Sequence, residues 1–238
     1  MSQKGTLSIN TQNIFPIIKK FLYADHEIFL RELVSNAVDA TQKLKKLASM
    51  GKFDGELGDL KIKVSFDEEA KTITISDRGI GMNPEEIDKY INQIAFSGAS
   101  DFVEKYKDSD AQEIIGHFGL GFYSAFMVAD TVDLTSRSCY SEDETEATLW
   151  QCDGSTEFTT TPAIKKDRGT EIVLHVAEDS MEFVNKARLS HVLTKYGKFL
   201  PVEIEFEGEV INNPSPIWIK SPSELKDEDY KNFYKELY

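Results

Sequence analysis

Short runs of alternating apolar and polar residues, set between segments with helical spacing, constrain the fold of this chain more than any other feature. Residues 61–66 and 72–77 alternate in this way, and the polar turn at 67–71 joins them as a predicted hairpin. Further strand-like runs lie at 131–138, 146–152, 171–176 and 202–206. Strands clustered among helices, with hairpins, predict an α+β fold with a mixed or antiparallel sheet.

Helices are predicted where apolar residues recur at helical spacing. The longest runs from a cap at Asp25 to about Met50, where glycine ends it. Another begins at Asn83, because Asn83, Pro84 and Glu86 supply an N-cap, a first-turn proline and an acid at the third position. Shorter helices are predicted at 10–21, 122–129, 181–199 and 221–238.

Charge and cysteine content exclude several classes of protein. The 238 residues carry 27 Lys and Arg against 41 Asp and Glu, a net charge of −14, which disfavours nucleic acid as a partner. Cys139 and Cys152 form no CxxC pair, so neither a disulfide framework nor a zinc site is indicated.

No apolar run approaches the ~18 residues of a membrane span, and the N-terminus has no apolar core of a signal peptide. We therefore expect a soluble, cytoplasmic protein that does not bind membranes.

Three polar residues of the long predicted helix share one face. Glu32, Asn36 and Asp39 fall within about 60° of one another at ~100° per residue. A buried polar stripe is costly unless something satisfies it, and a ligand or metal is one way to do so. On spacing alone, an ordinary solvated polar face explains the pattern better.

Three glycine-containing segments could approach a ligand closely. Asp77–Met82 follows a predicted strand, Gly116–Gly121 precedes a predicted helix, and Gly169-Thr170 opens another strand. Glycines before a helix free backbone N–H groups for phosphate oxygens, and a carboxylate at a strand end can accept from an exocyclic amine. Taken alone, Asp77–Met82 is slightly better explained as a tight turn, Gly116–Gly121 equally well as a hinge, and Gly169-Thr170 much better as a turn into a strand. Neither a P-loop nor a dinucleotide fingerprint is present.

The stretch Ser97–Gly121 differs in character from its surroundings. Small and charged residues predominate, glycines stand near both ends, and few apolar residues could anchor it to a core. Such a segment between glycine hinges is typical of a lid. We therefore predict a mobile lid over residues 97–121.

Taken in order, the motifs resemble the nucleotide site of the heat-shock protein 90 chaperones. The resemblance rests on Glu32–Ala40, Asp77–Met82, Gly116–Ser124 and Gly169–Ile172. The chain passes from Val210 to Trp218 without a long charged linker, as in the bacterial type of that family. The resemblance implies a two-layer α/β sandwich of the Bergerat type, with a mixed, mostly antiparallel sheet of about eight strands. It also implies an N-terminal ATPase domain at 1–216 and the start of a middle domain at 217–238.

The resemblance further implies a role for each candidate residue on the adenine side and at the reacting bond. Asp77 would accept from the adenine amino group, helped by Thr170. Gly81 and Met82 would line the base pocket. Glu32 would act as general base towards the attacking water.

The remaining candidate residues would act on the sugar and the phosphates. Asn36 would hold Mg²⁺ through its side-chain oxygen. Asp39 would lie near the sugar or the adenine edge. Gly119, Gly121 and Phe122 would offer backbone N–H groups to the phosphates.

Two positions depart from the usual pattern of the family. Phe96 stands where a lysine usually faces the phosphates, and His117 stands where glutamine is common. The arginine that the family uses in catalysis belongs to the middle domain and not to this chain.

The implied function is that of an ATP-dependent molecular chaperone of the stress response. It would bind Mg-ATP or ADP, hydrolyse ATP with the help of the middle domain, and act on client proteins as a homodimer when full-length. The 238-residue chain alone would be a monomer that turns over slowly or not at all. Two alternatives share the site: a histidine-kinase or topoisomerase-type ATPase, and a non-catalytic, nucleotide-gated interaction module.

Overall fold

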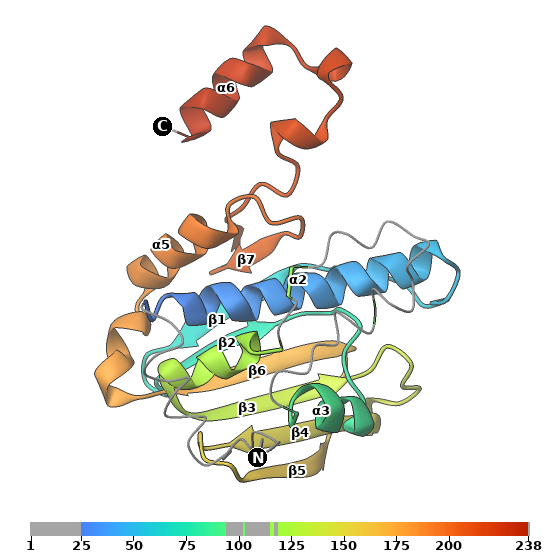
Figure 1. The fold of residues 1–238 in the computed structure, drawn as a ribbon, viewed down its shortest axis with the longest axis vertical. Helices are drawn as coiled ribbons and strands as arrows, with labels where there is room; N and C mark the ends of the chain where they lie inside the picture. The colour runs from blue at the N-terminus through green and yellow to red at the C-terminus, as the bar shows by residue number, and fades with distance from the viewer. Residues whose placement is uncertain (1–24, 94–101, 103–114, 117–118, 238) are drawn as a thin grey trace, which may run out of the picture.

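The computed structural model describes residues 25–93, 102, 115–116 and 119–237. The elements carry the labels of Figure 1. The predicted helix at 10–21, most of the predicted lid at 97–121, and Phe96 and His117 lie outside the described residues.

One eight-stranded sheet forms the larger layer of the described part of the chain, in the order β5-β4-β3-β6-β2-β1-β7-β8. The pairings are antiparallel except that of β1 with β7. The strands are β1 (Ile62–Asp67), β2 (Thr72–Ser76), β3 (Ala129–Arg137), β4 (Ala147–Cys152), β5 (Phe158–Ala163), β6 (Gly169–Val176), β7 (Ile204–Phe206) and β8 (Glu209–Val210). The predicted mixed, mostly antiparallel α+β sheet is confirmed.

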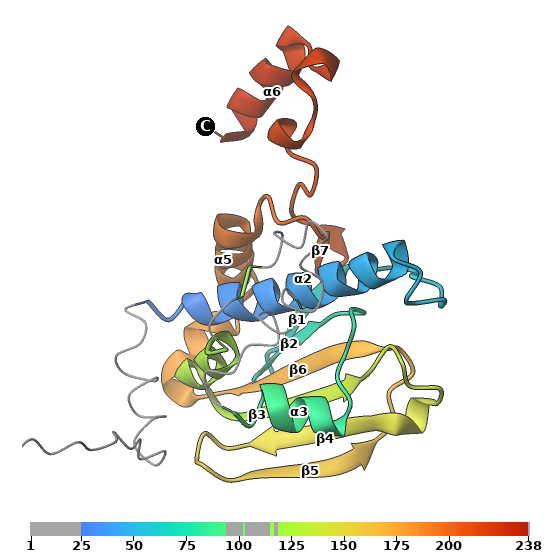
Figure 2. The same cartoon turned by 45° about the vertical axis from the view of Figure 1, so that its right-hand side comes forward.

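Helices form the second layer. Both α2 (Ile28–Ser49) and α3 (Pro84–Tyr90) lie over the same face of the sheet in Figures 1 and 2. The short 3₁₀ helix η3 (Gly121–Met127) packs between α2 and β3. Beside α2 lies α5 (Lys186–Gly197). The other helical elements are η4 (Glu144–Glu146), η5 (Glu178–Phe183), η6 (Ile217–Ile219), η7 (Pro222–Glu224) and α6 (Asp227–Leu237).

The core lies between these two layers. Alternate residues of the strands, such as Ile73 and Ile75 of β2, point into it and are fully buried. They meet an apolar stripe of α2 that includes Leu30, Leu33 and Val34. Burial of this stripe orients α2, because its polar face must then turn away from the sheet.

Several predicted boundaries needed correction. Helix α2 begins at Ile28 with Glu27 at the N-cap, and the side chain of Asp25 instead accepts a hydrogen bond from the Glu27 N–H at 3.0 Å. The predicted helix after Gly121 is a 3₁₀ helix. Of the predicted helix at 181–199, the first turns are 3₁₀ and α5 starts only at Lys186, where Asn185 caps it.

Two strands were missed by the sequence reasoning. Strand β5 is almost entirely exposed and consists largely of threonines with Pro162, so it has no apolar alternation to reveal it. Strand β8 is two residues long and depends on pairing with β7. Both lie at the edges of the sheet, where burial no longer shapes the sequence pattern.

The residues after 216 contact the rest of the chain through aromatic rings. The ring of Phe199 lies 4.8 Å from that of Trp218 and 5.9 Å from that of Phe233, measured between centroids. Figure 1 shows α6 standing away from the sheet. The predicted boundary between a domain at 1–216 and a second at 217–238 stays a prediction.

Candidate functional site

The polar face of α2 carries the three residues singled out by their spacing, and the structure brings them together. A Cβ atom on Gly121 would lie 2.8 Å from Glu32 Oε2 and 3.5 Å from Asn36 Nδ2. A Cβ atom on Gly116 would lie 3.2 Å from Asp39 Oδ2 and 3.5 Å from Asn36 Oδ1. Glu32, Asn36 and Asp39 therefore form one row under the two glycines, whose backbone approaches these side chains closely.

Asp39 is buried and binds backbone. Its two carboxylate oxygens accept hydrogen bonds from the N–H groups of Ile115 and Gly116, at 2.8 and 2.7 Å. A carboxylate that accepts several N–H groups is well satisfied in its charged form. Asp39 therefore fixes the chain at 115–116 against α2.

The carboxylate of Glu32 is held by its neighbour Arg31. Oε1 accepts from Arg31 Nη2 at 2.5 Å and from Arg31 Nε at 3.1 Å. This leaves Oε2 as the oxygen that faces Gly121. The pair thus fixes the orientation of the carboxylate, with one oxygen on Arg31 and the other towards the start of η3.

A second group of polar atoms surrounds Asp77, directly after β2. Its Oδ1 accepts from the Gly79 N–H at 2.8 Å and from the Thr170 N–H at 3.4 Å. Burial raises the pKa of Asp77 to about 6, although these hydrogen bonds and the charge of Lys165 favour the ionised form. A buried carboxyl group with a raised pKa is a mark of a functional site.

Two hydroxyl groups complete the surroundings of Asp77. Thr170 Oγ1 lies 2.9 Å from Ser136 Oγ, and Ser136 Oγ also accepts from the Met82 N–H at 2.9 Å. Ser136 is fully buried in β3, and the sequence reasoning missed it. The only feature of the sequence that could have indicated Ser136 was a hydroxyl residue at an inward-facing position of a predicted strand.

The turn after Asp77 packs directly on α2, which joins the two groups. The Ile80 N–H donates to the Ala40 carbonyl at 3.1 Å, one residue after Asp39. On its other side the turn binds the segment that follows β3, where the Ile80 carbonyl accepts from the Cys139 N–H at 2.7 Å. The carboxyl group of Asp77 and the polar face of α2 therefore have a fixed relation.

Gly81 should be irreplaceable in this turn. Its φ is +62°, and an added Cβ atom would lie 1.9 Å from the Arg137 carbonyl oxygen. We expect Gly81→Ala to lower the free energy of unfolding by about 2–4 kcal/mol, measured by urea denaturation. Gly51→Ala is the matched control, because Gly51 has φ +64° but nothing within 4 Å of the added atom. Equal losses in the two variants would contradict the steric argument.

Of the predicted phosphate-binding segment, Gly116 and the residues from Gly119 onwards are described. Gly119 has φ +64°, and Gly121 opens η3. Phe122 is buried, and its ring packs edge-to-face on those of Tyr123, Phe126 and Trp150, at 5.4 to 6.5 Å between centroids. These rings anchor η3 in the core and so fix the backbone of Gly121 against Glu32.

Within the described residues, no three His, Cys, Asp or Glu side chains gather as metal ligands. The family resemblance implies that the side-chain oxygen of Asn36 holds Mg²⁺, and this oxygen lies with Asp39 Oδ2 beside Gly116. Mg²⁺ usually takes few protein ligands and completes its shell with water and substrate phosphates. The amide oxygen of Asn36, close to the carboxylate of Asp39, is compatible with such a site. Among the described helices, none is long and apolar enough to cross a membrane.

Comparison with known proteins gave two family matches. Residues 24–192 match the model described as histidine kinase-, DNA gyrase B-, and HSP90-like ATPase. Residues 195–238 match the model described as Hsp90 protein. The change from one to the other falls within α5.

Curated relatives are similar along the whole chain. The chaperone protein HtpG of Porphyromonas gingivalis is 58% identical over 253 aligned residues, covering 100% of this chain and 36% of the relative. That of Bacteroides thetaiotaomicron is 59% identical over 99% of this chain and 36% of the relative. That of Psychromonas ingrahamii is 39% identical over 99% and 41%. The chain thus spans little more than a third of the length of these relatives.

Proposed function

The chain belongs to the family of histidine kinase-, DNA gyrase B- and HSP90-like ATPases, as an N-terminal domain of the HtpG type of Hsp90, and from this we propose that it binds adenine nucleotide. In the full-length protein, the same site would hydrolyse ATP to drive a chaperone cycle. The buried Asp77 carboxyl group, placed beside the polar face of α2, is the observation that carries this proposal.

The adenine would bind at Asp77. The exocyclic amine of adenine is a donor, and the Asp77 carboxylate can accept from it through Oδ2, since Oδ1 accepts from Gly79 and Thr170. The Thr170 and Ser136 hydroxyl groups, 2.9 Å apart, can hold a water molecule or a ring nitrogen beside it. Gly81 and Met82 would line the base, because their backbone is held close to β3.

The phosphates would lie over the polar face of α2, towards the start of η3. The backbone N–H groups of Gly119, Gly121 and Phe122 are proposed as donors to them. Asn36 would hold Mg²⁺, which when bound neutralises phosphate charge and orients the β- and γ-oxygens. Asp39 would keep residues 115–116 close to the sugar and phosphate region, through the two N–H groups that it binds.

Glu32 would act as the general base. Its Oε2 faces Gly121, where the terminal phosphate would lie, and Arg31 holds the other oxygen. A carboxylate within hydrogen-bonding reach of a water molecule can take its proton as the water attacks phosphorus. Because phosphoryl transfer needs an in-line arrangement, the fixed orientation of Glu32 is as important as its charge.

Nucleotide affinity should depend on pH through Asp77. Burial places the native pKa near 6, above 3.8 for the unfolded chain, so the contribution of Asp77 to stability is present at low pH and lost as pH rises through about 6. The affinity for adenosine should instead rise with pH, because the exocyclic amine of adenine donates more strongly to the ionised carboxylate of Asp77. We expect adenosine to bind about tenfold more weakly at pH 5 than at pH 7.5.

Isothermal titration calorimetry would measure this dependence. Adenosine is the ligand of choice because it has no phosphate that titrates in the same range. Thr170→Val should bind more weakly but keep the same pH dependence, since it leaves Asp77 in place. An affinity for adenosine that is flat between pH 5 and pH 7.5 would contradict the role of Asp77.

The location, assembly and partners of the full-length protein are proposed from its similarity to the relatives. We infer that the full-length protein is a cytoplasmic homodimer that binds client proteins, and that the 238-residue chain alone is a monomer. Steady-state phosphate release tests the function: the full-length protein should hydrolyse ATP, and the 238-residue chain should do so slowly or not at all. Transfer of labelled phosphate to the protein itself would favour the kinase alternative instead.

A further inference from the structure

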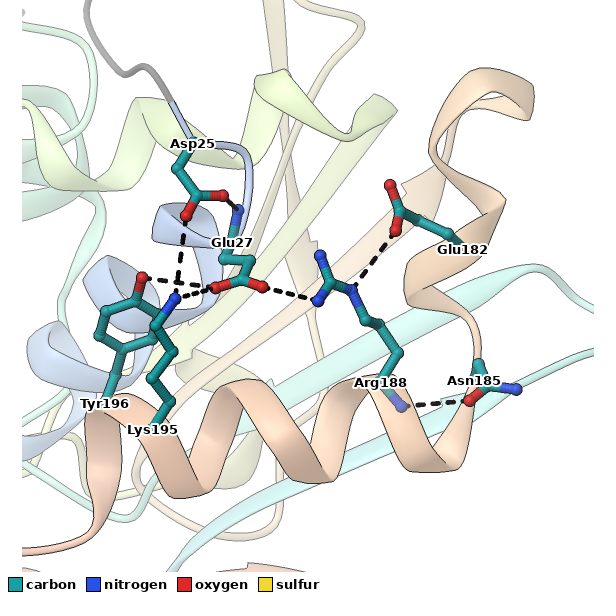
Figure 3. A network of polar contacts seen from close by, with 7 residues as sticks. All are labelled: Asp25, Glu27, Glu182, Asn185, Arg188, Lys195 and Tyr196. Atoms are coloured by element: carbon teal, nitrogen blue, oxygen red, sulfur yellow. Dashed lines mark hydrogen bonds and ion pairs between the residues drawn. The ribbon is translucent and has the colours of Figure 1, made fainter.

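A buried ionic cluster joins α5 to the start of α2 (Figure 3). The carboxylate of Glu27, at the N-cap of α2, is only 8% exposed. It accepts from Lys195 Nζ at 2.6 Å and pairs with Arg188 Nη1 at 2.6 Å, both from α5. The hydrogen bond from Lys195 is the main cause that lowers the pKa of Glu27, against the effect of burial.

The cluster ties the two helices together. Glu27 is buried, whereas the side chains of Arg188 and Lys195 are 32% and 44% exposed, so the ion pairs lie at the edge of the contact between α5 and α2. Tyr196, next to Lys195, adds its hydroxyl group at 3.4 Å from Glu27 Oε2. The ring of Tyr196 lies beside the first turns of α2, where it lines the hollow between α2 and α5.

This ring also contacts Arg31, one helical turn further along α2. The Arg31 guanidinium carbon lies 5.8 Å from the centroid of the Tyr196 ring, within the range of a cation–π interaction. Arg31 and Tyr196 line the same hollow between α2 and α5, together with Leu30 and Val34. The Arg31 side chain is 40% exposed, and the Tyr196 ring is its neighbour on the side of α5.

Arg31 in turn sets the orientation of Glu32, as the 2.5 Å contact to Oε1 and the approach of Oε2 to Gly121 show. A continuous line of contacts thus runs from α5 through Tyr196 and Arg31 to the carboxylate. We propose that Tyr196 is a positioning residue for Glu32, acting through Arg31. The inference rests on the proposed function, in which Glu32 activates water, and it adds α5 to the parts that determine the turnover rate.

The test is a double-mutant cycle on ATP hydrolysis by the full-length protein. Tyr196→Leu removes the ring and should lower kcat about three- to fivefold, the size of one partly exposed cation–π contact. KM for ATP and Kd for ADP should change less than twofold, because nothing that binds the nucleotide is altered. Tyr196→Phe keeps the ring and should restore kcat. In an Arg31→Gln background, Tyr196→Leu should have no further effect on kcat.

Controls separate this role from a structural one. Thr194→Ala changes an exposed residue of α5 outside the cluster and should leave kcat and melting temperature unchanged. If Tyr196→Leu does not fold, Tyr196→Gln takes its place, since it suits a partly exposed position but has no ring. The proposal would be overturned if kcat is unchanged in the variant without the ring. It would also be overturned if Tyr196→Phe loses as much kcat as Tyr196→Leu, or if Tyr196→Leu lowers kcat as much in the Arg31→Gln background as in the wild type. These outcomes all require hydrolysis by the unaltered protein, whose absence would instead refute the proposed function.

Discussion

Asp77→Asn should weaken ADP binding to the 238-residue chain by about a hundredfold or more, measured by calorimetry. An asparagine oxygen can replace the carboxylate oxygen that accepts from the Gly79 N–H. Its NH₂ group then faces the adenine amine, and two donors oppose each other in a buried site. If the asparagine amide rotates by 180°, its NH₂ group instead faces the N–H donors of Gly79 and Thr170. An unsatisfied buried donor of this kind costs about 1–3 kcal/mol, and here two are affected.

Asp67→Asn is the matched control for this substitution. Asp67 precedes β2 as Asp77 follows it, and its Oδ1 also accepts from two backbone N–H groups, those of Glu69 and Ala70 at 2.9 Å. The change removes the same charge from the protein at the opposite end of the strand. We expect wild-type ADP affinity. If Asp77→Asn also binds ADP like the wild type, adenine does not bind at Asp77.

Glu32→Ala should reduce ATP turnover by the full-length protein at least about a hundredfold, the usual contribution of a general base. Its ADP affinity should change less than about threefold, since the proposed role is in the transition state and not in binding. The physical reason is the orientation of the carboxylate, with Oε1 on Arg31 and Oε2 towards Gly121. A phosphate-release assay under saturating ATP measures the first quantity, and calorimetry the second.

The control for Glu32→Ala is Glu85→Ala, which removes an exposed carboxylate from the first turn of α3. It should hydrolyse ATP at the wild-type rate. Glu32→Gln should be as slow as Glu32→Ala, because the amide keeps the shape of the side chain but cannot take a proton. Turnover by Glu32→Ala above a tenth of the wild-type rate would refute the general-base role.

Much of the fold could be predicted where local sequence and burial agree. The β1–β2 hairpin was confirmed because alternate residues face the core, as Val64 and Ile75 do where they pair. The start of α3 was confirmed because Asn83 and Glu86 form both bonds of the capping box. Strand β5 was missed because an exposed edge strand has no buried face, and its pairing with β4 is a tertiary property.

The site was only partly predictable, for a similar reason. Helical spacing alone placed Glu32, Asn36 and Asp39 on one face, and the structure confirms that placement. Spacing could not show that this face turns towards Gly121, because that depends on which side of α2 the sheet buries. It also could not show the contacts of Ser136 or Tyr196, since their partners lie more than 30 residues away in the chain.

The most direct test of the account is a titration of the 238-residue chain with ADP in the presence of Mg²⁺, followed by heat and by melting temperature. We expect saturable binding at a single site and a melting temperature that rises with ADP concentration. At an ADP concentration of a hundred times Kd, binding should add about 2.7 kcal/mol to the free energy of unfolding. A chain that gives neither a binding heat nor a shift in melting temperature with ADP or ATP, while folded, would contradict it.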